Sequence, residues 1–488
     1  MNKELLRDNI LEEQIVNEGT ENVLHTPPQS VWQGIKDALK GTEADYTKIS
    51  LNKAIILLTI PMILELVMES TFALVDIFFV SKLGASAVAA VGLTETFLFL
   101  LYAIAMGLSM GVTAVVARRI GEKDREMAAR SAVQALILAI LCSVPFAFAG
   151  LLWSRELLGL MGADQWVLEE GHKYTQWMLG LNMVIVLLFV INAIFRGAGD
   201  AAIAMRVLIV SNIINIIMDP ILIFGFGPFE GMGIKGAAIA TNIGRGTAIA
   251  VQLWYLFKGG KHIRIRLNQL IWDAKIMFNI FKTSLGGIGQ QIIGMTSWIF
   301  LMRILAGIGS DAVAGSTIAL RIMLFTLMPA WGMANAVATL VGQNLGAGNP
   351  ERAESTVWKI GFYNMVFLIG VSFVYFFFNK SLMGIFSEEE GVITVGATWL
   401  KILSYSYFVY GWWMVTSQAF NGSGDTRTPT WINLIFFWII EIPLCYALAV
   451  PIEWGYSGVF WGCFIAETSA GLGTLWLFRK GKWKTVKV

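Results

Sequence analysis

Three acidic residues lie in a stretch of the chain that is otherwise almost entirely apolar. Glu65, Glu69 and Asp76 all fall within the run 52–81. Their spacings of four and seven residues place them on one face of a helix. A charged side chain in a membrane span costs about 2.5–3.5 kcal/mol on insertion scales. We therefore expect this stripe of acids to have a chemical role.

A further acid, Asp219 in another apolar run, is expected at about the same depth in the membrane as Asp76. Asp76 lies eight residues before Gly84, and Asp219 lies six residues before Gly225. At 1.5 Å per residue, both lie roughly 9–12 Å from the ends of their runs. Asn215 adds an amide one turn before Asp219. Oxygen ligands suit Na⁺, whereas burial beside a like charge suits a proton, so these residues leave both ions open.

The elements that hold these residues must cross a membrane. Only 14% of the 488 residues are charged and 56% are hydrophobic, whereas a soluble domain has about 25% charged residues. A spanning helix needs about 20 apolar residues, and the chain contains twelve such runs. They lie at 52–81, 86–118, 130–153, 173–195, 202–225, 236–257, 276–305, 312–345, 357–378, 394–420, 429–450 and 456–478.

Basic residues predict the orientation of the spans. They cluster after spans 2, 6 and 12, whereas the loops 82–87 and 225–235 are poor in Lys and Arg. By the positive-inside rule both termini are cytoplasmic, and we expect a multi-pass protein of the cell inner membrane. The clusters are Arg118, Arg119, Lys123, Arg125 and Arg130; Lys258, Lys261, Arg264, Arg266 and Lys275; and Arg479, Lys480, Lys482 and Lys484.

The chain is an internal repeat. A shift of 225 residues places 195–200 (FRGAGD) on 420–425 (FNGSGD), and Gly121 on Gly346. Six spans per half predict two parallel repeats related by a pseudo-twofold axis along the membrane normal. We therefore expect an all-α polytopic membrane protein of two six-helix bundles. Its predicted parts are a cytoplasmic tail (1–50), an N-lobe (51–258), a basic linker (259–275), a C-lobe (276–480) and a short tail (481–488).

The N-terminal tail contains one patterned segment. Apolar residues at helical spacing in 31–39 predict a short amphipathic helix at the cytoplasmic interface, with a weakly ordered tail as the alternative. The first fifty residues lack the apolar stretch of a cleavable signal peptide.

Several segments resemble the multidrug and toxic compound extrusion (MATE) family, and the resemblance covers residues 51–480. It implies a V of two six-helix bundles and the export of organic cations in exchange for Na⁺ or H⁺, with no other cofactor. The segments are 61–84 (PMILELVMESTFALVDIFFVSKLG), 341–346 (VGQNLG), 196–200 (RGAGD), and 215–220 (NIIMDP) followed by 236–238 (GAA).

The resemblance also implies a site. Its N-lobe cation or proton site corresponds to Asp76, Asp219 and Asn215, joined by Asn192 and Thr241; the two aspartates would hold the metal if sodium is the coupling ion. Second-tier candidates are Glu65, Glu69, Glu441 and Gln290. Some family members use an acid in span 7, but this chain has 289–291 (GQQ) there.

Other residues suggest a substrate cavity and an ion pair. Aromatic side chains bind flat cations by stacking, and the candidates are Tyr174, Trp177, Trp298 and Trp331. Arg245 and Glu467 occupy equivalent repeat positions, which suggests a pair between the lobes. The expected partners are small organic cations or amphiphiles and membrane lipid. A net charge of +2 gives no sign of nucleic-acid binding, and nothing requires more than a monomer.

Three alternative functions remain to be weighed. A lipid-linked saccharide or lipid flippase of the same superfamily would favour a basic cavity, whereas acids dominate spans 1 and 5. An enzyme is not expected, since His25, His172 and His262 form no catalytic constellation and the three cysteines have no ligand spacing. No filter-like segment suggests a channel.

Overall fold

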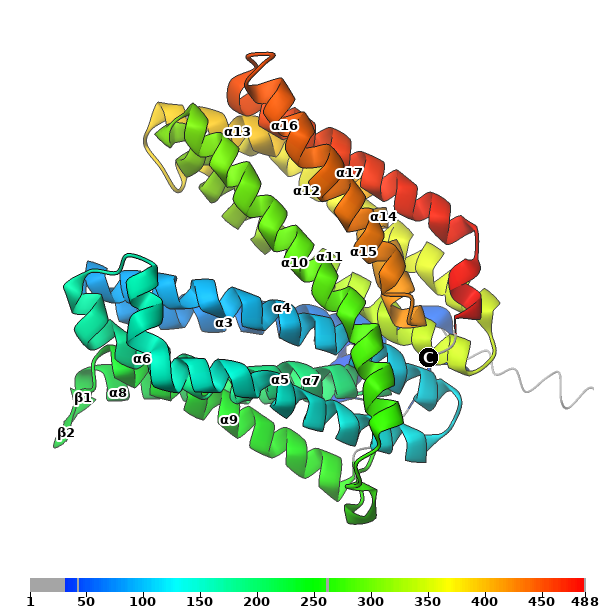
Figure 1. The fold of residues 1–488 in the computed structure, drawn as a ribbon. Helices are drawn as coiled ribbons and strands as arrows, with labels where there is room; N and C mark the ends of the chain where they lie inside the picture. The colour runs from blue at the N-terminus through cyan, green and yellow to red at the C-terminus, as the bar shows by residue number, and fades with distance from the viewer. Residues whose placement is uncertain (1–30, 42–43, 260–262, 487–488) are drawn as a thin grey trace, which may run out of the picture.

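The computed structural model describes residues 31–41, 44–259 and 263–486. Its helices form two bundles that meet at one end and diverge at the other, like a V (Figure 1). We call these the closed end and the open end. The closed end contains the basic turn after α4 (Ala85–Gly121) and the last turn of α9 (Ile234–Lys258), and the open end contains the short strands β1 (Gly225–Phe226) and β2 (Phe229–Glu230).

The first bundle, the N-lobe, contains six spans. Five are single helices, and the fourth consists of a π-helical turn (Val167–Gly171) followed by two α-helices. In order they are α3 (Leu51–Ser81), α4 (Ala85–Gly121), α5 (Arg125–Leu160), α6 (His172–Gly180) with α7 (Met183–Ala198), α8 (Ala201–Phe224) and α9 (Ile234–Lys258).

The second bundle, the C-lobe, repeats this order. Its fourth span is again broken, and its fifth contains a π-helical stretch at Leu434–Glu441. In order they are α10 (Ala274–Ile308), α11 (Ser310–Gly346), α12 (Pro350–Gly384), α13 (Glu390–Ser404) with α14 (Tyr407–Ser423), α15 (Arg427–Asn433) with α16 (Ile442–Ala449), and α17 (Gly455–Arg479).

The twelve predicted spans correspond to these helices. Nine helices in the described part of the chain are long and apolar enough to cross a membrane, and the bent pair α13 and α14 makes ten. The helices α9 and α17, with 25 residues each, complete the twelve. The helix α5 extends beyond the predicted third span, 130–153, because polar residues continue it at both ends.

The tenth span is not one straight helix. The axes of α13 and α14 differ by 66°. At the break, Ser404 donates to the carbonyl of Lys401 and Ser406 donates to the carbonyl of Leu403. Such local hydroxyl bonds compete with the backbone ladder and favour a bend.

The first helix of each lobe also packs with the other lobe. Leu58 and Met62, early in α3, belong to the apolar core of the C-lobe, while Ile280, early in α10, belongs to the core of the N-lobe. This exchange ties the bundles together at the closed end. A further helix, α2 (Val31–Lys40), precedes α3; its Ala38 is buried, while Trp32 is exposed. The rest of the predicted tail, 1–30, lies outside the described residues.

Glycines allow the two lobes to touch at the closed end. A Cβ on Gly121 of α4 would lie 2.1 Å from the carbonyl oxygen of Gln343 in α11. At the repeat-related position, a Cβ on Gly346 would lie 2.2 Å from the carbonyl oxygen of Arg118. Small residues commonly allow such backbone contact between membrane helices.

Candidate functional site

The predicted N-lobe site is assembled from α3, α8 and α9. Asp76, Asp219, Asn215 and Thr241 are all buried, with at most 9% of each residue exposed. Thr241 donates a hydrogen bond to Asp76 Oδ1 over 3.3 Å, and Asn215 Nδ2 donates to Asp219 Oδ1 over 3.1 Å. The carboxyl groups of Asp76 and Asp219 lie close enough to interact electrostatically. The fold therefore brings these four predicted residues together.

This group has oxygen atoms without partners. Asp219 Oδ2 and Asn215 Oδ1 are buried and accept no hydrogen bond from any described residue. Each belongs to a residue with no exposed surface. Because buried polar atoms are nearly always satisfied, two unpaired acceptors on adjacent turns suit a bound cation or a proton.

The two glutamates of α3 have a different environment. Arg196 Nη1 donates to Glu65, and Arg245 Nη2 donates to Glu69 Oε1 over 3.0 Å. Arg245 also donates to the hydroxyl of Tyr102 over 3.1 Å. Each of these carboxylates thus has a cation of its own.

The contacts of Arg245 overturn one interpretation of the sequence. We expected Arg245 to pair with Glu467 across the lobes, and this is wrong. Arg245 is buried within the N-lobe against α3, with its guanidinium 4.8 Å from the ring centre of Phe72. The sequence alone does not identify the partner of Arg245, because that partner depends on how α9 packs against α3.

Asn192 lies beside Glu65 rather than beside the aspartates. Its Oδ1 accepts a hydrogen bond from Gln252 Nε2 over 2.6 Å, and its side chain lies near Glu65. Sequence reasoning did not identify Gln252, Arg196 or Tyr102 as members of this network. The position of Arg196, in the repeated glycine-rich turn, was the one available signal.

The second-tier residues of the C-lobe lie in two places. Gln290 donates to Asn421 Oδ1 and to the carbonyl of Thr426, both over 3.0 Å, and so joins α10 to the α14–α15 turn. Glu441 is 4% exposed and interacts electrostatically with Glu467 on α17. Within the described residues, neither glutamate forms an ion pair.

The four aromatic candidates for the cavity are divided between the lobe interiors and their edges. Tyr174 is 2% exposed in the core of the N-lobe. Trp298 stacks on Trp399 with ring centres 5.4 Å apart. Trp331 packs against the core of the C-lobe, and the ammonium of Lys235 lies 5.6 Å from the ring centre of Trp177. A role of these residues in substrate binding stays a prediction.

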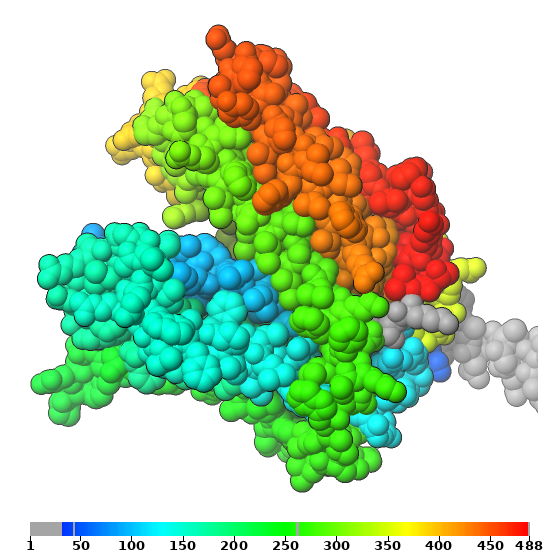
Figure 2. All heavy atoms as spheres, viewed as in Figure 1, coloured from blue at the N-terminus to red at the C-terminus, as the bar shows by residue number. Residues whose placement is uncertain are grey.

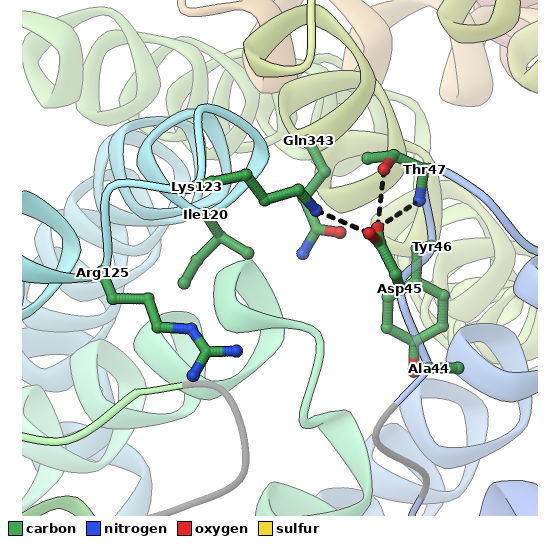
Figure 3. A pocket seen from close by; sticks show the side chains of 8 residues that line it. All are labelled: Ala44, Asp45, Tyr46, Thr47, Ile120, Lys123, Arg125 and Gln343. Atoms are coloured by element: carbon green, nitrogen blue, oxygen red, sulfur yellow. Dashed lines mark hydrogen bonds and ion pairs between the residues drawn. The ribbon is translucent and has the colours of Figure 1, made fainter.

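A small pocket marks the closed end between the lobes (Figure 3). Its volume is about 100 Å³. Asp45 points into it and accepts hydrogen bonds from Lys123 over 2.7 Å and from the Thr47 hydroxyl over 2.6 Å. Burial alone would raise the pKa of Asp45, but these hydrogen bonds outweigh it and lower the pKa to about 2. The lining residues are Ala44, Asp45, Tyr46, Thr47, Ile120, Lys123, Arg125 and Gln343.

The segment 44–47, which lines this pocket, contacts both lobes. The Tyr46 hydroxyl donates to the carbonyl of Gly199 in the N-lobe over 3.0 Å, and Arg352 of the C-lobe donates to the carbonyl of Tyr46 over 3.1 Å. Gln343 of α11 donates to the carbonyl of Gly197 over 2.9 Å. The closed end is therefore sealed by polar contacts as well as by the glycines.

Comparison with known proteins identifies the family and the fold. The family model MatE matches residues 61–221 and 284–447, which lie in the two lobes and together make up more than half of the chain. The chain belongs to the MatE family. It is a multi-pass membrane transporter and not an enzyme, and transport in this family is coupled to an ion.

Individual relatives support this family assignment over nearly the full length. A probable multidrug resistance protein NorM of Thermotoga maritima is 26% identical, covering 89% of this chain and 93% of that protein. An FAD transporter of Shewanella oneidensis is 27% identical over 88% of this chain and 95% of that protein. A solved structure described as the outward-facing conformation of a multidrug resistance MATE family transporter matches with a TM-score of 0.82 and 27% identity, over 93% of this chain and 99% of that chain.

Proposed function

We propose that this MatE transporter exports amphipathic, cationic organic molecules in exchange for Na⁺ or H⁺, which bind at Asp76 and Asp219. We place it in the cell inner membrane with both termini in the cytoplasm. The relatives named multidrug resistance and multidrug export proteins support the substrate class. A match to such proteins disfavours the flippase alternative.

One observation carries the assignment of the coupling site. Of the four acids near the middle of the N-lobe, Glu65 and Glu69 are paired with Arg196 and Arg245. Asp76 and Asp219 pair with no described cation and receive hydrogen bonds only from neutral groups. Of these four acids, the two aspartates are therefore the ones without an ion-pair partner, and a proton or a sodium ion would compensate their charge.

The V supplies the route. The lobes leave a cleft between them at the open end (Figure 2). Basic residues cluster at the closed end, so by the positive-inside rule the cleft would open to the outside. A cation or proton arriving from outside neutralises the Asp76–Asp219 site and bends α3 near Pro61, which lies inside the helix. Substrate then leaves outward, and the reset exposes the cavity to the cytoplasm.

The test is ethidium efflux from cells that express equal amounts of wild type, Asp76→Asn or Asp219→Asn. We expect the efflux rate of both variants to fall at least about tenfold. The amide of asparagine neither binds a proton nor carries the negative charge that would hold a sodium ion. Glu126→Gln is the matched control, since this exposed acid pairs only with Arg130 among the described residues. Unchanged efflux in both aspartate variants would refute the site.

Two further conditions separate the remaining choices. Replacing sodium by choline at a fixed proton gradient stops efflux only if sodium is the coupling ion. If the wild type exports no ethidium, an anionic dinucleotide should be assayed, since one relative is an FAD transporter. Transport of that anion alone would overturn the cationic substrate class.

A further inference from the structure

The helices α4 of the N-lobe and α11 of the C-lobe each turn one face toward the opposite lobe. Gln291 of α10 donates to the sulfur of Met106 in α4 over 3.4 Å. Ser70 of α3 donates to the sulfur of Met328 in α11 over 3.2 Å. These contacts fix which face of α4 and of α11 meets the other lobe.

The same two faces bear opposite charges nearer the open end. Glu95 precedes Met106 by eleven residues and Arg321 precedes Met328 by seven, and at about 100° per residue each charged residue lies within about 20° of its methionine. Glu95 therefore lies on the face of α4 that meets the C-lobe, and Arg321 lies on the face of α11 that meets the N-lobe. Both are exposed in this structure.

The two residues also lie at matching depth. Glu95 follows the start of α4 at Ala85 by ten residues, and Arg321 follows the start of α11 at Ser310 by eleven. At 1.5 Å per residue they lie about 15 and 16.5 Å from the open ends of their helices. The two side chains, both within the described part of the chain, form no ion pair with each other, although their charges already interact.

We propose that Glu95 and Arg321 form an ion pair when the open ends of the lobes come together, and that this pair stabilises the outward-closed state. It rests on the alternating access of the proposed function, but on neither its substrate nor its coupling ion. Closure removes water from between the two charges, so their attraction strengthens in that state. In the open state both side chains remain solvated, so the pair favours one state over the other.

The test measures the distance between the lobes in the full-length protein in lipid nanodiscs. Spin labels at Lys82→Cys and Ser310→Cys, two exposed open-end positions, report closure after the three native cysteines are replaced by alanine. We expect Glu95→Gln or Arg321→Gln to lower the ratio of closed to open molecules about tenfold, which lies within the usual range of coupling between states. The charge swap Glu95→Arg with Arg321→Glu should restore the wild-type ratio.

Two controls separate loss of the ion pair from loss of folding. Melting temperature and monodispersity identify variants that fail to fold, and the swap retains both charges in the cleft. Unchanged distances in both single variants would refute the ion pair. A swap variant whose closed-to-open ratio falls as far as both single variants combined would refute it too. The distances are measured without dye. A wild type that exports no ethidium would therefore contradict the proposed substrate but not the proposed ion pair.

Discussion

The close contact of Gly121 in α4 with Gln343 in α11 makes a specific prediction about the balance between the two transport states. In Gly121→Ala the new Cβ would lie 2.1 Å from a backbone oxygen, whereas ordinary contact begins at 3.4 Å. The helices must therefore separate by 1.3 Å at the closed end, because a backbone atom cannot rotate out of the way. Overpacking of this kind costs about 1–3 kcal/mol. The penalty applies only to the state in which the closed end is sealed.

The expected result is a shift toward molecules whose cytoplasmic end is open. A penalty of about 1–3 kcal/mol changes the ratio of two states by about 5–150-fold. Spin labels at Glu126→Cys of α5 and Ser355→Cys of α12, both exposed, would report a longer distance at the closed end. The ethidium efflux rate should fall in parallel, since one state of the cycle becomes poorly populated.

Gly92→Ala is the matched control. Gly92 also lies within α4, but a Cβ there meets nothing within 4 Å. Alanine favours the helix slightly more than glycine, so this variant should keep the wild-type distances and melt no earlier. If Gly121→Ala and Gly92→Ala give the same distance distributions as the wild type, the glycine contact does not hold the lobes together and the reasoning is refuted.

Two further predictions concern the polar contacts. The carboxylate of Asp45, whose pKa is about 2, stabilises the closed end at any pH above the ordinary value of about 3.9. This contribution disappears as the pH falls toward 2. The melting temperature of Asp45→Asn should thus lie below that of the wild type by a constant amount from pH 8 to pH 5, and the difference should shrink below about pH 4; a difference that grows in acid would contradict this. Arg245→Gln leaves Glu69 without its cation, and we expect it to lower stability by about 3 kcal/mol. Adding Glu69→Gln should recover part of the loss in a thermal melt, whereas an equal or larger loss in the double variant would show that the ion pair is not the cause.

Much of the architecture follows from short-range patterns. The runs that became α3 and α8 are long, apolar and bounded by polar residues, and a helix satisfies its own backbone hydrogen bonds in lipid, so these patterns suffice to place the spans. The repeat of glycine-rich turns likewise predicts two bundles of the same topology. Asp76 and Asp219 could be selected as candidates because charge is rare inside such runs.

The sequence could not supply the partner of each charged side chain. Glu65, Glu69 and Asp76 follow one another on one helical stripe, yet the first two meet arginines and the third meets a threonine. Which of them is neutralised depends on how α7 and α9 cross α3. Those crossings are set by packing between residues more than a hundred positions apart, which no local pattern records.

The sequence by itself thus determined the membrane class, the span count, the twofold repeat and the acids that require an explanation. Tertiary structure decided that the lobes touch at one end through Gly121 and Gly346, that span ten bends, and that Glu95 and Arg321 lie on helix faces turned toward the opposite lobe. The physical reason is one of range. Helix formation and membrane insertion depend on neighbours within a few turns, whereas the side that a helix presents and the partner it meets depend on the whole set of contacts.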